Sequence, residues 1–139
     1  YRFIEGEAQY PFGFGLSYTE FGYENAKIIS ADENKIKLSV EITNKGSLDG
    51  IEKAQVYAKY TDSRTVTPNF QLCGIKSVKL AAGEKAEVEF EIDRYWLKAV
   101  IDDGSRVDPD GNIALFVGGH QPDSVSDRLT GYSCLKVEL

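Results

Sequence analysis

Few residues in this sequence could carry out chemistry, and they are scattered. The sequence has one histidine, His120, and two cysteines, Cys73 and Cys134, whereas metal sites usually combine several His or Cys ligands. We therefore expect His120 to be a solvated or hydrogen-bonded loop residue. The two cysteines lie far apart in the sequence, and two buried free thiols are favoured over a single disulfide bridge.

Residues 108–112, with the sequence DPDGN, have the composition of a calcium-binding loop. Such a loop carries glycine at its sixth position and acidic residues at its first and last positions. With Gly111 at the sixth position, the first position is Arg106 and the last is Val117. Neither side chain can bind calcium, so this segment is interpreted as a β-turn.

Two glycine-containing patterns near the N-terminus also lack the residues that their chemistry needs. Ser17 follows Gly15, but a nucleophile elbow would have glycine where the sequence has Thr19. Residues 13–15 begin like a dinucleotide-binding fingerprint, but Tyr18 replaces its third glycine. The carboxylates are distributed over turns and alternating segments. The sequence therefore predicts no catalytic, metal-binding or cofactor-binding residue, and no cofactor.

Length and charge limit the class of protein. A chain of 139 residues has the size of one domain, and its formal net charge of −6 argues against nucleic acid as a partner. No apolar run is long enough to span a membrane, and no secretion signal is recognisable. No Asn-x-Ser/Thr site occurs either, which favours the cytoplasm. The chain begins with Tyr1 rather than Met, however, so localisation stays open.

Short alternating segments dominate the rest of the sequence. In residues 36–42 and 86–92, apolar residues occupy every second position and polar or charged residues lie between them. This period is typical of strands with one face in the core. A helical turn is expected near Trp96, a polar loop at 120–127, and no amphipathic helix. Further strands are expected at 23–31, 54–60, 75–80, 113–117 and 129–139. Seven or eight short strands predict an all-β fold, a β-sandwich.

The N-terminal segment is unusually rich in aromatic residues. Eight of the sixteen aromatic residues fall within the first twenty-three positions, although terminal segments are usually small and polar. Pro11, with glycines at positions 13 and 15, favours an irregular and extended conformation. We expect an aromatic arm or interdomain linker over residues 1–20, followed by the sandwich over residues 21–139. The arm needs an apolar surface to cover it.

The arm sequence at residues 10–21, YPFGFGLSYTEF, closely resembles the segment that leads into the fibronectin type III-like domain of glycoside hydrolase family 3 enzymes. That family contains β-glucosidases and β-xylosidases. Further matches follow in the same order at residues 44–50 (NKGSLDG), 72–80 (LCGIKSVKL) and 116–119 (FVGG). Together they cover most of the chain. The resemblance implies an immunoglobulin-like or fibronectin type III-like sandwich.

The resemblance also implies a function. In family 3 the nucleophilic aspartate and the acid/base carboxylate belong to other domains, and this chain matches neither of those segments. It implies a non-catalytic accessory domain that packs against and stabilises the catalytic domains of the same polypeptide. The parent protein would be a glycosidase of carbohydrate metabolism that hydrolyses O-glycosyl bonds. The residues expected to dock on those domains are Tyr10, Pro11, Phe12, Phe14, Leu16 and Tyr18.

A carbohydrate-binding module is the alternative function. Sugars bind flat aromatic surfaces, and Trp96 and Tyr57 could form one if their rings point outward, with oligosaccharide as the partner. Tyr95 and Tyr60 are further candidates. A core position is the favoured interpretation for Trp96, because a large ring gains most free energy when it is buried.

Overall fold

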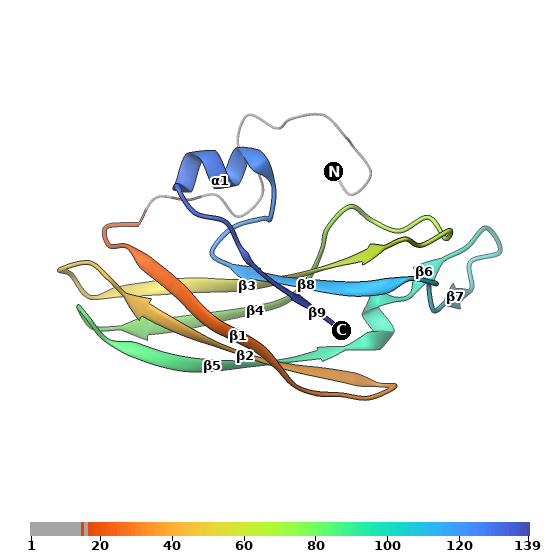
Figure 1. Cartoon of the computed structure of the whole chain (residues 1–139), viewed down its shortest axis with the longest axis horizontal. Helices are drawn as coiled ribbons and strands as arrows, with labels where there is room; N and C mark the ends of the chain where they lie inside the picture. The colour runs from red at the N-terminus through yellow and green to blue at the C-terminus, as the bar shows by residue number, and fades with distance from the viewer. Residues whose placement is uncertain (1–14, 16) are drawn as a thin grey trace.

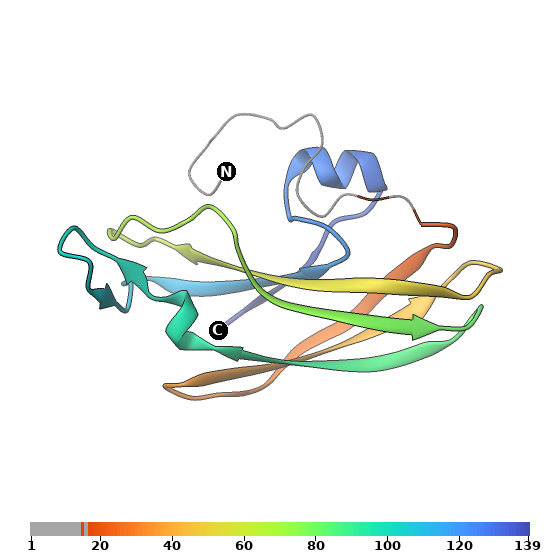
Figure 2. The ribbon, with the colours of Figure 1, turned by 180° about the vertical axis from the view of Figure 1, so that it is seen from behind.

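The computed structural model describes residue 15 and residues 17–139, and these residues form two larger antiparallel sheets and one two-stranded sheet. The first sheet has the order β1-β2-β5, with β1 at Phe21–Ala31, β2 at Lys35–Asn44 and β5 at Lys85–Asp93. The second has the order β4-β3-β8-β9, with β3 at Gly50–Thr61, β4 at Gln71–Leu80, β8 at Asn112–Gly118 and β9 at Leu135–Glu138. Figures 1 and 2 show the two sheets stacked as layers. The predicted all-β sandwich is confirmed.

The core lies between the two layers and is built from the alternating positions. The aliphatic residues of β2 and β5 face those of β3 and β8, and the most deeply buried of them are Ile36, Leu38, Val40, Ile42, Ala54, Val56 and Leu115. Each fully buried aliphatic side chain contributes about 1.5–3 kcal/mol through removal of apolar surface from water. The sequence alternation therefore identified the core face of β2 correctly.

Short elements close the ends of the sandwich. The predicted helical turn is the 3-10 helix η1 at Arg94–Leu97, and it leads into a two-stranded ribbon of β6 (Ala99–Val100) and β7 (Arg106–Val107). In Figure 1 these elements lie at the end opposite the start of β1. Lys98 Nζ forms an ion pair with Asp108 at 3.0 Å, which ties η1 to the turn that follows β7.

The polar loop predicted at 120–127 and the start of the strand predicted at 129–139 are wrong in part, because residues there form the helix α1 (Ser124–Thr130) and the strand β9 begins only at Leu135. The Asp123 carboxylate accepts from the amides of Val125 and Ser126, and Gly131 ends the helix with a φ of 81°. Seven residues are too few to produce a clear periodic pattern, so the capping residues Asp123 and Gly131 are the sequence features that indicate this helix. Within the described part of the chain no helix is long and apolar enough to cross a membrane.

Candidate functional site

A pocket lies where the described part of the arm, the arm root (residue 15 and residues 17–20), meets the sandwich. Its volume is about 240 Å³. The arm root forms one wall, the start of β3 another, and the end of α1 with the segments on either side of this helix a third. The lining residues are Gly15, Ser17, Thr19, Glu20, Phe21, Glu52, Gly119, His120, Leu129, Thr130 and Tyr132. The fold thus brings together three segments that are far apart in the sequence.

Glu52 supplies a half-buried carboxylate to this pocket. The Tyr23 hydroxyl donates a hydrogen bond to Glu52 Oε1 over 2.6 Å. Burial raises the pKa of Glu52, and the hydrogen bond from Tyr23 opposes this shift. Burial and the neighbouring Glu52 charge raise the pKa of the Tyr23 hydroxyl as well. The ionised form of Glu52 is therefore less favourable here than in water.

His120 is 1% exposed and lies beside the pocket. Its Nδ1 lies 2.8 Å from the Gln121 carbonyl oxygen, and its Nε2 lies 3.1 Å from the Tyr132 carbonyl oxygen and 3.0 Å from Thr130 Oγ1. The ring also packs against the Tyr132 ring at 4.7 Å. The expectation of a hydrogen-bonded loop residue holds, but the side chain is buried rather than solvated. Its hydrogen bonds attach the segment after α1 to the end of β8.

The two cysteines are free, as favoured from their spacing. The Cys73 thiol lies 3.3 Å from the Val56 carbonyl oxygen, and the Cys134 thiol donates to the His120 carbonyl oxygen over 3.2 Å. Burial raises the pKa of each thiol to about 12. Because the thiolate is the reactive form, neither side chain is a suitable nucleophile near neutral pH.

The run at residues 44–50 attaches the arm root to the sandwich. The buried Asn44 amide oxygen accepts from Thr19 Oγ1 at 2.6 Å and from the Gly46 amide at 3.1 Å. Its amide nitrogen donates to the carbonyl oxygens of Leu48 and Leu80. A Cβ atom on Gly46 would lie 2.0 Å from Thr19 Oγ1, so this close approach requires glycine. Side-chain contacts therefore hold Thr19 of the arm root against the sandwich.

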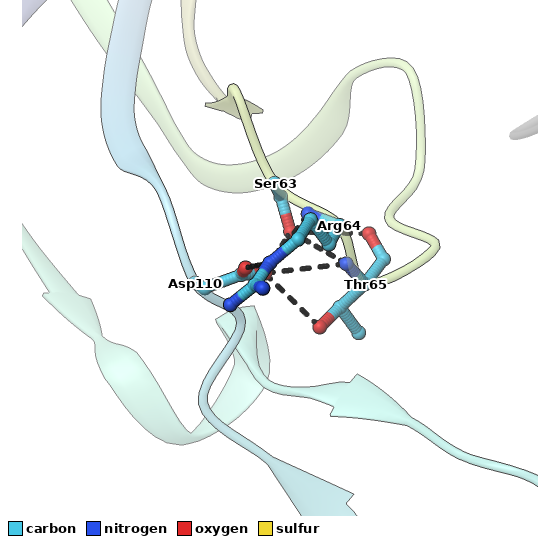
Figure 3. Close-up of polar contacts among 4 residues, drawn as sticks. All are labelled: Ser63, Arg64, Thr65 and Asp110. Carbon is cyan, nitrogen blue, oxygen red and sulfur yellow. Dashed lines mark hydrogen bonds and ion pairs between the residues drawn. The ribbon is translucent and has the colours of Figure 1, made fainter.

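The Asp110 carboxylate organises the loop between β3 and β4, as Figure 3 shows. Its oxygens accept from the Ser63 hydroxyl, from the amides of Arg64 and Thr65 and from the Thr65 hydroxyl, at 3.0 to 3.3 Å, and from Arg64 Nε at 2.8 Å. The hydrogen bonds from Arg64 and Ser63 hold the pKa of Asp110 well below its usual range. Residues 108–112, which have the composition of a calcium loop, thus direct the Asp110 carboxylate at the loop between β3 and β4. Among the described residues no group of three or more His, Cys, Asp or Glu side chains could hold a metal ion.

The aromatic candidates for sugar contact separate into buried and exposed residues. Tyr57 is 2% exposed, and its hydroxyl donates to Gln55 Oε1 over 2.7 Å. Burial leaves this ring no open face, which removes Tyr57 from the candidates for sugar contact. Trp96 is 58% exposed, so its expected core position is wrong. Tyr95 packs edge to face against Trp96 at 5.2 Å, and the Arg106 guanidinium lies over both rings.

Of the residues expected to dock on other domains, Tyr18 is described and is 97% exposed. The others, Tyr10, Pro11, Phe12, Phe14 and Leu16, lie outside the described residues. Sequence reasoning did not single out Glu52, Tyr23 or the role of Asp110. Only the loop chemistry of residues 108–112 could have drawn attention to Asp110, because an acidic residue in a turn often binds backbone amides.

The two packed antiparallel sheets define a β-sandwich module. The model of the fibronectin type III-like domain matches residues 52–121. This chain belongs to that family.

The relatives that this chain matches are much larger proteins. The chain is 31% identical to a putative beta-xylosidase of Formosa agariphila, covering 88% of this chain and 17% of that protein. The beta-glucosidase 3B structure from Thermotoga neapolitana superposes with a TM-score of 0.81 at 28% identity, covering 96% of this chain and 17% of that one. The GH3 beta-glucosidase from Bifidobacterium adolescentis gives a TM-score of 0.77 at 27% identity, with 94% and 18% covered. The resemblance to the fibronectin type III-like domain of family 3 enzymes is confirmed, and the chain spans less than a fifth of these relatives.

Proposed function

We propose that this chain is a non-catalytic accessory domain of a family 3 glycoside hydrolase, which packs against and stabilises the catalytic domains of the same polypeptide. The observation that carries the proposal is the coverage: 96% of the chain matches 17% of a beta-glucosidase. The parent protein would then hydrolyse O-glycosyl bonds. A small module within a large enzyme has its own core, and its remaining apolar surface is available for its neighbours.

Exposed apolar side chains support the packing role. Tyr18, in the arm root, is 97% exposed. On the outer face of the four-stranded sheet, Ile51 and Ile75 are each 59% exposed. Large apolar residues gathered on one face are typical of surfaces that are covered in the intact protein. We therefore propose that residues 1–20 form an arm or interdomain linker that docks on the neighbouring domains and that residues 21–139 form the sandwich.

The test uses the intact polypeptide that contains this chain and compares Tyr18→Ala with Tyr95→Ala. Both changes remove an exposed tyrosine ring, but only Tyr18 lies on the proposed docking arm. Loss of one interface tyrosine is expected to shorten the half-life of glycosidase activity near the inactivation temperature about tenfold. Tyr95→Ala should leave that half-life unchanged.

Two results would contradict the proposal. One is equal half-lives for the intact protein and both variants, since an arm that stabilises nothing can be altered freely. The other is glycosidase activity in the isolated 139-residue chain, which would place catalysis within it.

A second candidate function is sugar binding at the corner formed by Trp96, Tyr95 and Arg106. The exposed Trp96 ring favours it, because an aromatic face combined with a guanidinium group is suited to a sugar ring and its hydroxyls. Gln71 Nε2 donates to the Trp96 carbonyl oxygen, which attaches η1 to β4. The hydrogen bond from Gln71 and the packing of Arg106 on the ring thus hold Trp96 in place.

Trp96 is the only tryptophan in the sequence, so its fluorescence reports directly on this corner. Titration with gluco- and xylo-oligosaccharides should give a saturable change in emission if the corner binds sugar. Arg106→Ala should weaken the response while the fluorophore is kept. Emission that stays constant across both sugar series would exclude this function.

A further inference from the structure

Arg106 holds its charge over two aromatic rings instead of in an ion pair. Its guanidinium carbon lies 5.0 Å from the centre of the Tyr95 ring and 5.7 Å from the centre of the Trp96 ring. Arg64, by contrast, forms an ion pair with Asp110 at 2.8 Å. Within the described part of the chain, the Arg106 guanidinium has no ion pair and no hydrogen bond. Its N–H groups therefore remain available as donors.

The carboxylates close to Arg106 in the sequence do not neutralise it. Asp108 forms its ion pair with Lys98 at 3.0 Å. Asp103 accepts from the amide two residues further along the chain at 2.8 Å, which closes the turn between β6 and β7. Asp102 forms no ion pair with any described residue. An anion from outside the chain would therefore meet no carboxylate already bound to this guanidinium.

The rings below the guanidinium are held in place but stay accessible. The Asp93 carboxylate caps η1 by accepting from the Tyr95 amide at 2.9 Å, and Gln71 donates to the Trp96 carbonyl oxygen. The two rings meet edge to face at 5.2 Å, yet Trp96 is 58% and Tyr95 49% exposed. Side chains that are already fixed lose little conformational entropy when a ligand binds. The corner is thus a preorganised surface that combines apolar rings with one positive charge.

We propose that this corner binds a sugar that carries a carboxylate, a uronic acid residue, with the sugar ring on Trp96 and the carboxylate on Arg106. The inference rests on sugar binding at this corner, the second candidate function above. A guanidinium group suits a carboxylate because its planar N–H groups donate two parallel hydrogen bonds. The exposed rings offer apolar surface to the C–H groups of the sugar. A neutral sugar would use the same rings but would leave the positive charge without an anion.

The test follows the emission of Trp96, the only tryptophan, while the chain is titrated with methyl β-D-glucuronoside or with the corresponding uronamide. The two probes share one sugar ring and differ in the charge of a single group. The glucuronoside should give a saturable change in emission and bind about tenfold more tightly than the uronamide. Salt at about 1 M, where the Debye length is about 3 Å, should reduce this preference.

Two variants separate the charge of Arg106 from the charge of the whole chain. Arg106→Gln keeps a planar donor but loses the charge, so its affinity for the glucuronoside should fall to that for the uronamide. Arg128→Gln is the matched control, because it removes one positive charge from an exposed residue of α1. Figure 1 shows α1 far from η1 and the β6–β7 ribbon, so this variant should bind the glucuronoside as the unmodified chain does.

Equal affinities for the two probes would overturn the inference and leave neutral sugar binding at the corner standing. Unchanged affinity in a folded Arg106→Gln variant would overturn it as well. Constant emission with both probes would refute the acidic-sugar site and count against sugar binding at this corner altogether. The accessory-domain function would be unaffected by any of these results, because its test is the half-life of the Tyr18→Ala variant.

Discussion

Replacing Leu38 with alanine is expected to lower the free energy of unfolding by about 3–5 kcal/mol. Leu38 is 0% exposed and lies on β2, the central strand of its sheet, opposite Ile28 on β1 and Phe90 on β5. Removal of its side chain leaves a cavity that strands hydrogen-bonded on both sides cannot close. Urea unfolding followed by circular dichroism measures the loss.

Leu48→Ala is the matched control, because it deletes the same atoms from an exposed turn residue. Its expected effect is within about 0.5 kcal/mol. Similar losses for the two variants would mean that the space between the layers is not tightly packed, which would contradict the assigned core.

Replacing Gly111 with alanine is expected to cost about 3 kcal/mol or more, because it combines left-handed strain with a backbone clash. Gly111 has a φ of 99°. A Cβ atom there would lie 2.3 Å from the Thr61 carbonyl oxygen and 3.0 Å from the Ser63 amide nitrogen. The displaced loop would also pull Asp110 away from its partners. Chemical unfolding gives the energy, and hydrogen exchange at the Arg64 amide reports the loss of the loop contacts.

Gly104→Ala separates the two contributions to that cost. Gly104 has a φ of 84°, but a Cβ atom added there would meet no other atom within 4 Å. Its expected cost is therefore the conformational strain, about 1–2 kcal/mol. Equal losses of stability in Gly111→Ala and Gly104→Ala would contradict this prediction. They would mean that the loop after β3 can shift without cost and that the Asp110 contacts do not hold this loop in one conformation.

The fold was predictable to the extent that its signals were local. The alternation at residues 36–42 and 86–92 identified β2 and β5, since a strand with one face in the core repeats every two residues. The position of η1 was also recognisable from its flanking charges. Helix α1 was missed, because two turns of helix between polar residues leave too short a pattern to distinguish from a loop.

The candidate site was less predictable. Trp96 was expected in the core, but its side chain is largely exposed to solvent, whereas the Tyr57 side chain is buried. Tyr57 shares its face of β3 with Gln55 and Lys59, and the burial of that second face depends on what the rest of the chain places over it. Trp96 lies in the short helix η1, where no alternation indicates which side is buried. The contacts between Asp110 and the Ser63 to Thr65 loop depend on the pairing of β3 with β8, which no short motif encodes.

The sequence by itself determined the all-β class, the core face of the clearest strands and the family, because alternation and the motifs at residues 10–21 and 44–50 are properties of neighbouring residues. Only the tertiary structure decided that Glu52, His120 and Tyr132 line one pocket beside the arm root, with Tyr23 hydrogen-bonded to Glu52. These residues come from β1, β3 and the segments on either side of α1. Their meeting depends on strand order and register, which are set by packing of the whole core rather than by any local pattern.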